Sequence, residues 1–285
     1  MTNRTKFVMK LMGGLGNQMF QISAALTLSE TMCRNVTLDT TWYKNRVDQN
    51  SHDSIPHVLR FPFLNCIATF EEDYWKYFVR KVGREIWNIS GKRRFVETEI
   101  EYPSDFSLPV DFDFYEGYFQ SLHFIPRRIA IDDVFNFSQF DFPLSNIETT
   151  NKIGVHIRLG DYLNSKIHKV SEITYLEKGL EILSSYTKFD DIIIFTDSPS
   201  LVTKFIPRSI SKICSIAEKI SDPILQLSQM ASCKYFVGSA SSFSWWAAYL
   251  NPNKITKTIV MPANVFNDYS LKHLSSRYPK EWNVI

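Results

Sequence analysis

The sequence predicts an α/β protein made of two domains, each built around a parallel β-sheet. Segments with strand-like and helix-like patterns alternate along both halves of the chain, which is typical of parallel sheets. A polar stretch with a proline at residues 138–151 interrupts the alternation, as a linker does. A length of 285 residues also fits two domains of about 150 residues each. We therefore expect an N-terminal domain over residues 1–145 and a C-terminal domain over residues 150–285, whose tail can cross back to the first domain.

The first half begins with a strand, a glycine-rich turn and a helix. The apolar residues 7–12 predict the strand, and the spacing of apolar side chains over residues 18–32 predicts the helix. A second strand at residues 36–38 completes a β-α-β unit. The rest of this half predicts an irregular loop at residues 44–65, a helix at residues 70–87 and an aromatic strand at residues 113–119.

The second half repeats this alternation. Residues 191–195 form a continuous apolar run, which is typical of a strand covered on both faces. The other expected strands lie at residues 152–157, 235–237 and 258–261, and the expected helices lie at residues 175–183, 224–230 and 243–250. Two such domains leave a cleft at the carboxyl ends of their strands, where α/β proteins bind ligands.

The charges of the chain nearly cancel, since 32 Lys and Arg face 30 Asp and Glu for a net charge of +2. This balance argues against nucleic-acid binding, which usually needs a clear basic excess. An apolar fraction of 44% argues against disorder. A small anionic ligand stays compatible with the composition, because it needs only one or two well-placed cations.

The cysteines and the N-terminus predict a reduced, cytoplasmic protein. The cysteines have irregular spacing and form no CxxC pair, which predicts buried free thiols rather than a disulfide or zinc framework. They are Cys33, Cys66, Cys214 and Cys233. The short polar segment at residues 1–6 lacks the apolar stretch of a signal peptide. No run of about 18 apolar residues offers a membrane span.

A glycine-rich turn at residues 13–18 (GGLGNQ) follows the first strand and opens the first helix. Glycines permit close backbone approach, and a helix N-terminus favours negative charge, so the turn fits a phosphate or pyrophosphate. A plain tight turn is the alternative. Gly14 and Gly16, with Asp39 about 20 residues later, also approach the dinucleotide-binding fingerprint of an oxidoreductase. The missing third glycine argues against that function.

His156, Arg158 and Asp161 cluster at the carboxyl end of a predicted strand. An arginine can bind phosphate through two parallel hydrogen bonds. Asp161 could orient that arginine or accept a proton. The alternative is a structural pair of Arg158 and Asp161 beside a turn.

Two further strands end in polar turns. Asp197 could accept hydrogen bonds from a ribose, a base or a sugar, or Asp197 or Ser198 could cap the next helix. Residues 238–246 (GSASSFSWW) place hydroxyl and backbone N–H groups at a strand-to-helix junction, which suits a second anion site. A capped helix with tryptophans in the core is the alternative. Together, these turns predict a nucleotide-type anionic ligand held between two α/β domains.

Four of these segments are distinctive in sequence and in order: GGLGNQMFQ at residues 13–21, HIRLGDY at 156–162, FTDS at 195–198 and SSFSWW at 241–246. Together they resemble the α-1,2-fucosyltransferase family, glycosyltransferase family 11, over about residues 7 to 250. The resemblance implies a GT-B-like fold with two Rossmann-like α/β domains facing a cleft. It implies GDP-β-L-fucose as the donor, inversion at the anomeric carbon, and no metal or other cofactor. It also implies an oligosaccharide acceptor, such as the 2-hydroxyl of galactose in a bacterial O-antigen or capsule.

Two positions depart from the family pattern. Leu159 stands where the family usually has a second arginine, and Ser198 stands where it usually has a second acid. The protein O-fucosyltransferases resemble this chain in using a single arginine at the matching place, so one arginine can suffice. Leu159 leaves open a glycosyltransferase of the same fold that uses a different nucleotide sugar.

The resemblance also implies the residues of the site. Arg158 would stabilise the charge that develops on the β-phosphate, helped by Asn17 and by the 241–242 turn. Asp161 is the first candidate for a catalytic base, and His156 is the second. The expected donor-binding residues are Gly14, Gly16, Asn17, Gln18, His156, Arg158, Asp197, Ser241, Ser242 and Phe243.

Other interpretations stay open. Asp111 and Asp113 form a DxD pattern of the kind that holds a metal, although they lie on an aromatic strand. A non-catalytic sugar-binding module would need no arginine aimed at phosphate. Residues 70–94 combine an apolar helical stripe with basic side chains, which predicts either a core-packed helix or an interfacial helix on anionic lipid. The second would suit a lipid-linked acceptor and a protein peripheral to the inner face of the bacterial membrane.

Overall fold

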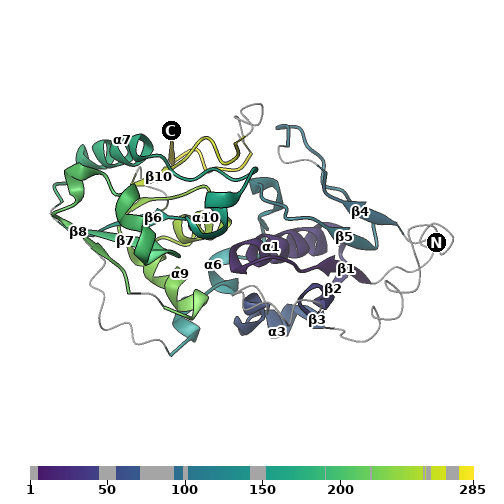
Figure 1. Cartoon of the computed structure of the whole chain (residues 1–285). Coiled ribbons are helices and arrows are strands. Elements are labelled where there is room, and N and C mark those ends of the chain that lie inside the picture. Colours follow the sequence, from purple (N-terminus) through teal and green to yellow (C-terminus); the bar gives the residue numbers. More distant parts are fainter. Residues whose placement is uncertain are drawn as a thin grey trace. The chain divides into compact units, whose positions relative to one another are not determined.

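The computed structural model of the chain forms two compact units, Met1–Gln139 and Phe140–Ile285 (Figure 1). The residues described are 6–44, 56–70, 93–98, 102–141, 152–189, 191–218, 220–252, 254, 258–267 and 276–285. The domain boundary expected between residues 145 and 150 lies outside them.

A parallel sheet organises the N-terminal unit. In the described residues its strand order is β3-β2-β1-β5-β4, and every neighbouring pair is parallel. The strands are β1 (Lys6–Lys10), β2 (Asn35–Asp39), β3 (Ala68–Phe70), β4 (Arg94–Val96) and β5 (Phe114–Glu116). The strand order places β1 at the centre of the sheet, and its residues Phe7, Val8 and Met9 are buried.

The glycine-rich turn leads into α1 (Leu15–Met32), which connects β1 to β2 and is largely buried from Leu15 to Leu28. The helix ends at Cys33, whose φ of 50° lies in the left-handed region. This position leaves the Cys33 thiol exposed, so the prediction of buried thiols is wrong for this residue. Cys214 is half-buried and Cys233 is buried, and all three thiols are free.

Shorter helical segments complete the N-terminal unit. They are α2 (Thr41–Lys44), α3 (Leu64–Ile67), α6 (Ile131–Val134) and the 3₁₀ turns η1 (His57–Arg60), η2 (Leu122–Phe124) and η3 (Phe137–Gln139). The loop expected at residues 44–65 is therefore partly helical where it is described. The helix expected at residues 70–87 lies outside the described residues except for Phe70, which ends β3.

A second parallel sheet organises the C-terminal unit, with the strand order β11-β10-β9-β6-β7-β8 in the described residues. The strands are β6 (Ile153–Ile157), β7 (Ile192–Thr196), β8 (Cys214–Ile216), β9 (Tyr235–Val237), β10 (Ile259–Met261) and β11 (Asn283–Val284). Because β6 lies between β9 and β7, the strand order changes direction at β6. Open α/β sheets bind ligands at such a point, beyond the carboxyl ends of the strands.

The helical segments of this unit follow its strands. They are α7 (Ile173–Ser184), α8 (Pro199–Val202), α9 (Pro223–Ser232), α10 (Ser242–Tyr249) and the 3₁₀ turns η5 (Gly160–Asn164), η6 (Thr203–Phe205) and η7 (Arg208–Ile210). An apolar core joins β6, β7, β9 and α7, and Leu159 belongs to it with no exposed surface.

The predicted α/β class with parallel sheets is confirmed, and the long predicted strands and helices of the C-terminal unit are present. Four short strands, β3, β4, β8 and β11, were not predicted, because two or three residues are too few to show a period. The chain's last residues add β11 to this sheet, since Val260 and Met261 pair with Asn283 and Val284. The expected crossing of the tail back to the first domain stays a prediction.

Candidate functional site

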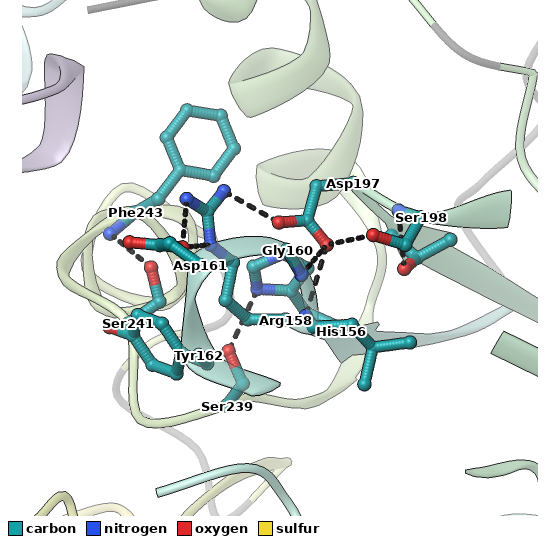
Figure 2. A network of polar contacts seen from close by, with 12 residues as sticks. His156, Arg158, Gly160, Asp161, Tyr162, Asp197, Ser198, Ser239, Ser241 and Phe243 are labelled. Atoms are coloured by element: carbon teal, nitrogen blue, oxygen red, sulfur yellow. Dashed lines mark hydrogen bonds and ion pairs between the residues drawn. The ribbon is translucent and has the colours of Figure 1, made fainter. Parts of the chain in front are cut away.

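The end of β6 places Arg158 between two carboxylates, as Figure 2 shows. Its Nε and Nη2 atoms lie 3.1 and 2.8 Å from Asp161 Oδ1, and its Nη1 atom lies 3.0 Å from Asp197 Oδ2. Burial opposes the charge of Arg158, but the nearby carboxylates of Asp197 and Asp161 outweigh it and raise the pKa of the guanidinium. The Arg158 side chain is still 34% exposed, so a charged guanidinium stays accessible to an anionic ligand.

Asp197 ties the end of β7 to the turn after β6. Its Oδ1 accepts hydrogen bonds from the backbone N–H groups of Leu159 and Gly160, at 3.0 and 3.2 Å. This approach needs a glycine, because a Cβ on Gly160 would lie 2.4 Å from Asp197 Oδ2. Ser198 does take the N-cap position of α8, but its side chain makes no capping hydrogen bond. The alternative of a side-chain cap by Asp197 or Ser198 therefore gives way to a brace between two strands.

Asp161 is the more exposed of the two carboxylates that hold Arg158. Its side chain is 65% exposed, against 24% for Asp197. It lies in η5, three residues after the arginine, so the structural Arg–Asp pair that the sequence left open is present. Being exposed, Asp161 is also the partner that a ligand can displace at the lower cost.

His156 is buried at the end of β6, and its Nδ1 lies 3.0 Å from Ser239 Oγ. Burial, and then the charge of Arg158, lower its pKa to about 3 against the opposing effect of Asp197. The imidazole is therefore neutral near pH 7 and a weak base. A buried imidazole with a lowered pKa is a poor proton acceptor, so Asp161 stays the first candidate for the base.

The β9–α10 turn holds both features that the sequence suggested. Ser241 caps α10, since its Oγ accepts a hydrogen bond from the Phe243 backbone N–H at 3.2 Å. Trp245 and Trp246 are fully buried, so the tryptophans serve the core. Ser242 is the first residue of the helix, whose opening turn has N–H groups without helical partners. A capped helix and an anion-binding terminus are thus compatible here.

In the N-terminal unit, α1 begins after Gly14, which provides no side-chain cap. Gly13 has a φ of 77°, as glycine allows. The fully buried amide of Gln18 donates to the Gly13 carbonyl at 2.9 Å and accepts from the Val58 N–H at 2.9 Å. Both polar groups of the Gln18 side chain therefore bond to the backbone of the N-terminal unit. The expected contact of this side chain with the nucleotide sugar stays a prediction. Asn17 is half-buried, and its Oδ1 accepts a hydrogen bond from Gln120.

The acids that suggested other functions have structural partners. Asp39 is the acid that the dinucleotide-binding fingerprint would need. It is 2% exposed and accepts a hydrogen bond from the Thr41 N–H at 2.9 Å. Asp113 pairs with Arg34 at 3.1 Å and accepts from the Arg93 N–H. Within the part of the chain that the structure describes, no group of His, Cys, Asp and Glu side chains could hold a metal ion.

The site contains three side chains whose roles were not predicted from the sequence: Ser239, Tyr162 and His168. Ser239 contacts His156, and Tyr162 stacks on His168 with ring centroids 4.7 Å apart. The Arg158 guanidinium lies 5.7 Å from the centroid of the Tyr162 ring. Both Tyr162 and Ser239 fall inside motifs that the sequence indicated, but no local pattern shows which side chains a turn brings together.

A pocket of about 210 Å³ lies beside the β9–α10 turn. Its lining includes Ala240 from that turn, Pro262 and Asn264 after β10, and Lys169 and Tyr175 near the start of α7. The pocket thus adjoins the same turn that carries the N-terminus of α10.

Two parallel-sheet units, one with a cation and a helix N-terminus at its switch point, define a GT-B-like α/β protein. The solved structures of the fucosyltransferase NodZ from Bradyrhizobium share this fold, including one co-crystallised with GDP. The selenomethionine structure of NodZ and the structure with GDP each match at a TM-score of 0.50 and 12% identity, over 88% of this chain and 94% of their own length. The model of glycosyl transferase family 11 matches residues 81–285. The chain therefore belongs to glycosyltransferase family 11 and is a glycosyltransferase.

Two relatives from Escherichia coli cover most of the chain. The O-antigen biosynthesis glycosyltransferase WbnK is 25% identical over 90% of this chain and 93% of its own length. An alpha-1,2-colitosyltransferase is 24% identical over 88% of this chain and 90% of its own length. Among the described residues, no helix is long and apolar enough to cross a membrane.

Proposed function

We propose that the protein transfers L-fucose from GDP-β-L-fucose, with inversion, to the 2-hydroxyl of a galactose in a bacterial surface glycan. Membership of glycosyltransferase family 11 and the O-antigen relative support this proposal. The observation that carries it is the Arg158 guanidinium, which stays charged and accessible at the switch point of the sheet. The N-terminus of α10 follows the neighbouring strand and adds a second group that favours a phosphate.

The diphosphate is expected to replace Asp161 on Arg158. The Nε–Nη2 edge of the guanidinium, which holds Asp161 Oδ1, is the edge that binds two phosphate oxygens side by side. Asp197 keeps the Nη1 group on the opposite side, because it is more buried and is anchored to two backbone N–H groups. Donor binding would therefore release the Asp161 carboxylate beside the reacting centre.

Transfer then forms one bond and breaks another at the anomeric carbon. The acceptor hydroxyl attacks C1 of the fucose while the bond from C1 to the β-phosphate oxygen breaks, and GDP leaves from the opposite face. The proton of the hydroxyl passes to Asp161. Arg158 and the α10 N-terminus stabilise the negative charge that develops on the β-phosphate, a type of contribution worth about 3–4 kcal/mol. The predicted help from Asn17 stays a prediction, and the reaction is proposed to need no metal.

A screen of donors and acceptors tests the proposed function. The purified chain is incubated with GDP-β-L-fucose and a β-galactoside, and the linkage of the product is determined. We expect fucose on O2 of galactose, with turnover unchanged by excess chelator. Loss of activity with chelator would refute the metal-independent mechanism, and a GDP thermal-shift assay separates the enzyme from a sugar-binding module that ignores nucleotide.

The alpha-1,2-colitosyltransferase relative favours a second candidate, transfer of colitose from its GDP derivative. Colitose is fucose without the 3-hydroxyl, so a site that binds this hydroxyl would discriminate strongly between the two donors. Leu159 does not decide between them by direct contact, because its side chain lies in the core. The ratio of kcat/KM for the two donors separates the candidates: a higher value for GDP-colitose would replace fucose in the proposal.

A peripheral membrane contact through residues 70–94 belongs to the same proposal and rests on the sequence pattern alone. It would bring the enzyme to a lipid-linked acceptor. We expect co-sedimentation with vesicles rich in anionic lipid at low salt and release at high salt. Absence of binding at low salt would remove this part of the proposal.

A further inference from the structure

A buried hydroxyl faces the imidazole of the site. Ser239, at the turn after β9, is 1% exposed, and His156, at the end of β6, is 5% exposed. Ser239 Oγ lies 3.0 Å from His156 Nδ1, and Figure 2 draws this contact as a dashed line. The Ser239 backbone is fixed as well, since its N–H donates to Ser244 Oγ at 2.8 Å. The pair therefore joins neighbouring strand ends across the switch point.

The hydrogen-bonding needs of Ser239 determine the tautomer of His156. In the described part of the chain, the Ser239 hydroxyl has no hydrogen-bond partner except this nitrogen. If Nδ1 carried a proton, the hydroxyl hydrogen would be buried without an acceptor, at a cost of about 1–3 kcal/mol. Nδ1 is therefore the acceptor, and Nε2 of the neutral ring carries the proton.

That Nε2–H group is itself without a partner among the described residues. In the described residues, the charges of Arg158 and Asp197 act on the His156 ring, and the centroid of the Phe243 ring lies 6.2 Å from it. His156 Nε2 does not belong to the buried side-chain atoms that lack a partner in this part of the chain, so solvent reaches it and a ligand can reach it too. A ligand that binds Arg158 brings acceptor oxygens to the same strand end.

We propose that Ser239 is a positioning residue that holds His156 as a neutral Nε2–H donor to an oxygen of the nucleotide diphosphate. The ligand half of this inference rests on the proposed function, because it needs a nucleotide at Arg158. The tautomer half stands on the geometry of Ser239 and His156 alone. His156 thus contributes a hydrogen bond and no proton transfer.

The tautomer can be read directly by ¹⁵N NMR of protein labelled at histidine, with the His156 signals assigned by their loss in His156→Gln. At pH 7 we expect Nε2 protonated and Nδ1 unprotonated. Ser239→Ala should weaken this preference to that of a free neutral imidazole, and Ser239→Thr, which keeps the hydroxyl, should restore it. Ser228→Ala is the matched control, because Ser228 is also buried but donates to Leu225 of its own helix. A protonated Nδ1 in the parent protein would overturn the inference.

GDP is the probe for the ligand half. Saturating GDP should move the Nε2 and Hε2 signals of His156, and Ser239→Ala should weaken GDP binding by about fivefold, as expected for one lost hydrogen bond. His156→Gln can still offer an N–H donor and should bind GDP better than His156→Phe. If GDP binds without moving these signals, the ligand half of the inference is overturned while the proposed function stands. Failure of the parent protein to bind GDP would overturn the proposed function and the ligand half with it, while the tautomer arm would still be decided.

If Ser239→Ala fails to fold, the comparison of His156→Gln with His156→Phe decides the ligand half. Equal GDP affinity in these two variants would contradict a donated hydrogen bond. The tautomer half is then decided by the parent protein's spectrum.

Discussion

Substitution of Gly160 by alanine should break the brace that positions Arg158. The new Cβ would lie 2.4 Å from Asp197 Oδ2 and 3.2 Å from its Cγ. Ordinary contacts begin near 3.4 Å, so Asp197 must retreat by about 1 Å. That movement lengthens the ion pair to Arg158 and the hydrogen bonds to the Leu159 and Gly160 N–H groups, which now measure 3.0, 3.0 and 3.2 Å.

We expect a loss of about 2 kcal/mol in unfolding free energy, since a charged acceptor moves away from two N–H groups. For a chain of this size each kcal/mol shifts Tm by about 2–4 °C, which gives a fall of about 4–8 °C. A similar loss of transition-state stabilisation corresponds to a fall of about 30-fold in kcat/KM. Thermal unfolding and initial rates with GDP-β-L-fucose measure the two effects.

Two controls show whether the effect passes through Asp197. Gly179→Ala adds the same methyl group in α7, where its Cβ would meet Val237 Cγ1 at a milder 3.1 Å, and should leave activity unchanged. In an Asp197→Ala background the clash is absent, so Gly160→Ala should cost little more. Full activity in Gly160→Ala, or an equal loss in both backgrounds, would refute the reasoning.

Further predictions concern the other residues of the site and fold. Asp161→Asn should lower kcat at least tenfold while GDP binds as well or better, because Arg158 loses a competing carboxylate; full turnover would reject Asp161 as the base. Gln18→Ala should lower the unfolding free energy by about 1–3 kcal/mol, since it leaves the buried Val58 N–H unpaired while the Gly13 carbonyl keeps its hydrogen bond from Tyr43; urea titration measures this, and an unchanged midpoint would contradict the bracing role. His156 has a folded pKa of about 3, below its unfolded value of 6.5, so the unfolded chain binds more protons as pH falls. Its contribution therefore destabilises the fold by about 2 kcal/mol on going from pH 7 to pH 5, and His156→Gln should flatten this slope; identical slopes would show that His156 is not buried neutral.

The sequence predicts the framework of the site because that framework follows from local patterns. The continuous apolar run at residues 191–195 identifies β7, since a covered strand needs apolar side chains on both faces. Arg158 and Asp197 directly follow β6 and β7, so their placement at one edge of the sheet comes with the strands themselves. The glycine-rich turn likewise identifies the start of α1.

The partners of each polar group could not be predicted in the same way. Gln18 was expected to contact the nucleotide sugar. Its side-chain amide accepts a hydrogen bond from Val58, 40 positions along the chain, which the sequence did not predict. Asp197 was expected to bind a ligand or cap a helix; its Oδ1 also accepts hydrogen bonds from a turn 37 and 38 positions away, which the sequence did not predict. Such contacts depend on how distant segments pack, which no local spacing records. Leu159 shows the same limit, because only the fold reveals that its side chain faces the core.

The rate of fucose transfer by Arg158→Ala tests the central claim most directly. Its matched control is Arg208→Ala, which removes an exposed arginine in the same unit. With GDP-β-L-fucose and a β-galactoside, we expect Arg158→Ala to stay folded and to lose about 10²–10³-fold in kcat/KM, while Arg208→Ala keeps the parent value. A value for Arg158→Ala within about threefold of the parent, less than 1 kcal/mol of barrier, would contradict the claim that this guanidinium stabilises the leaving diphosphate.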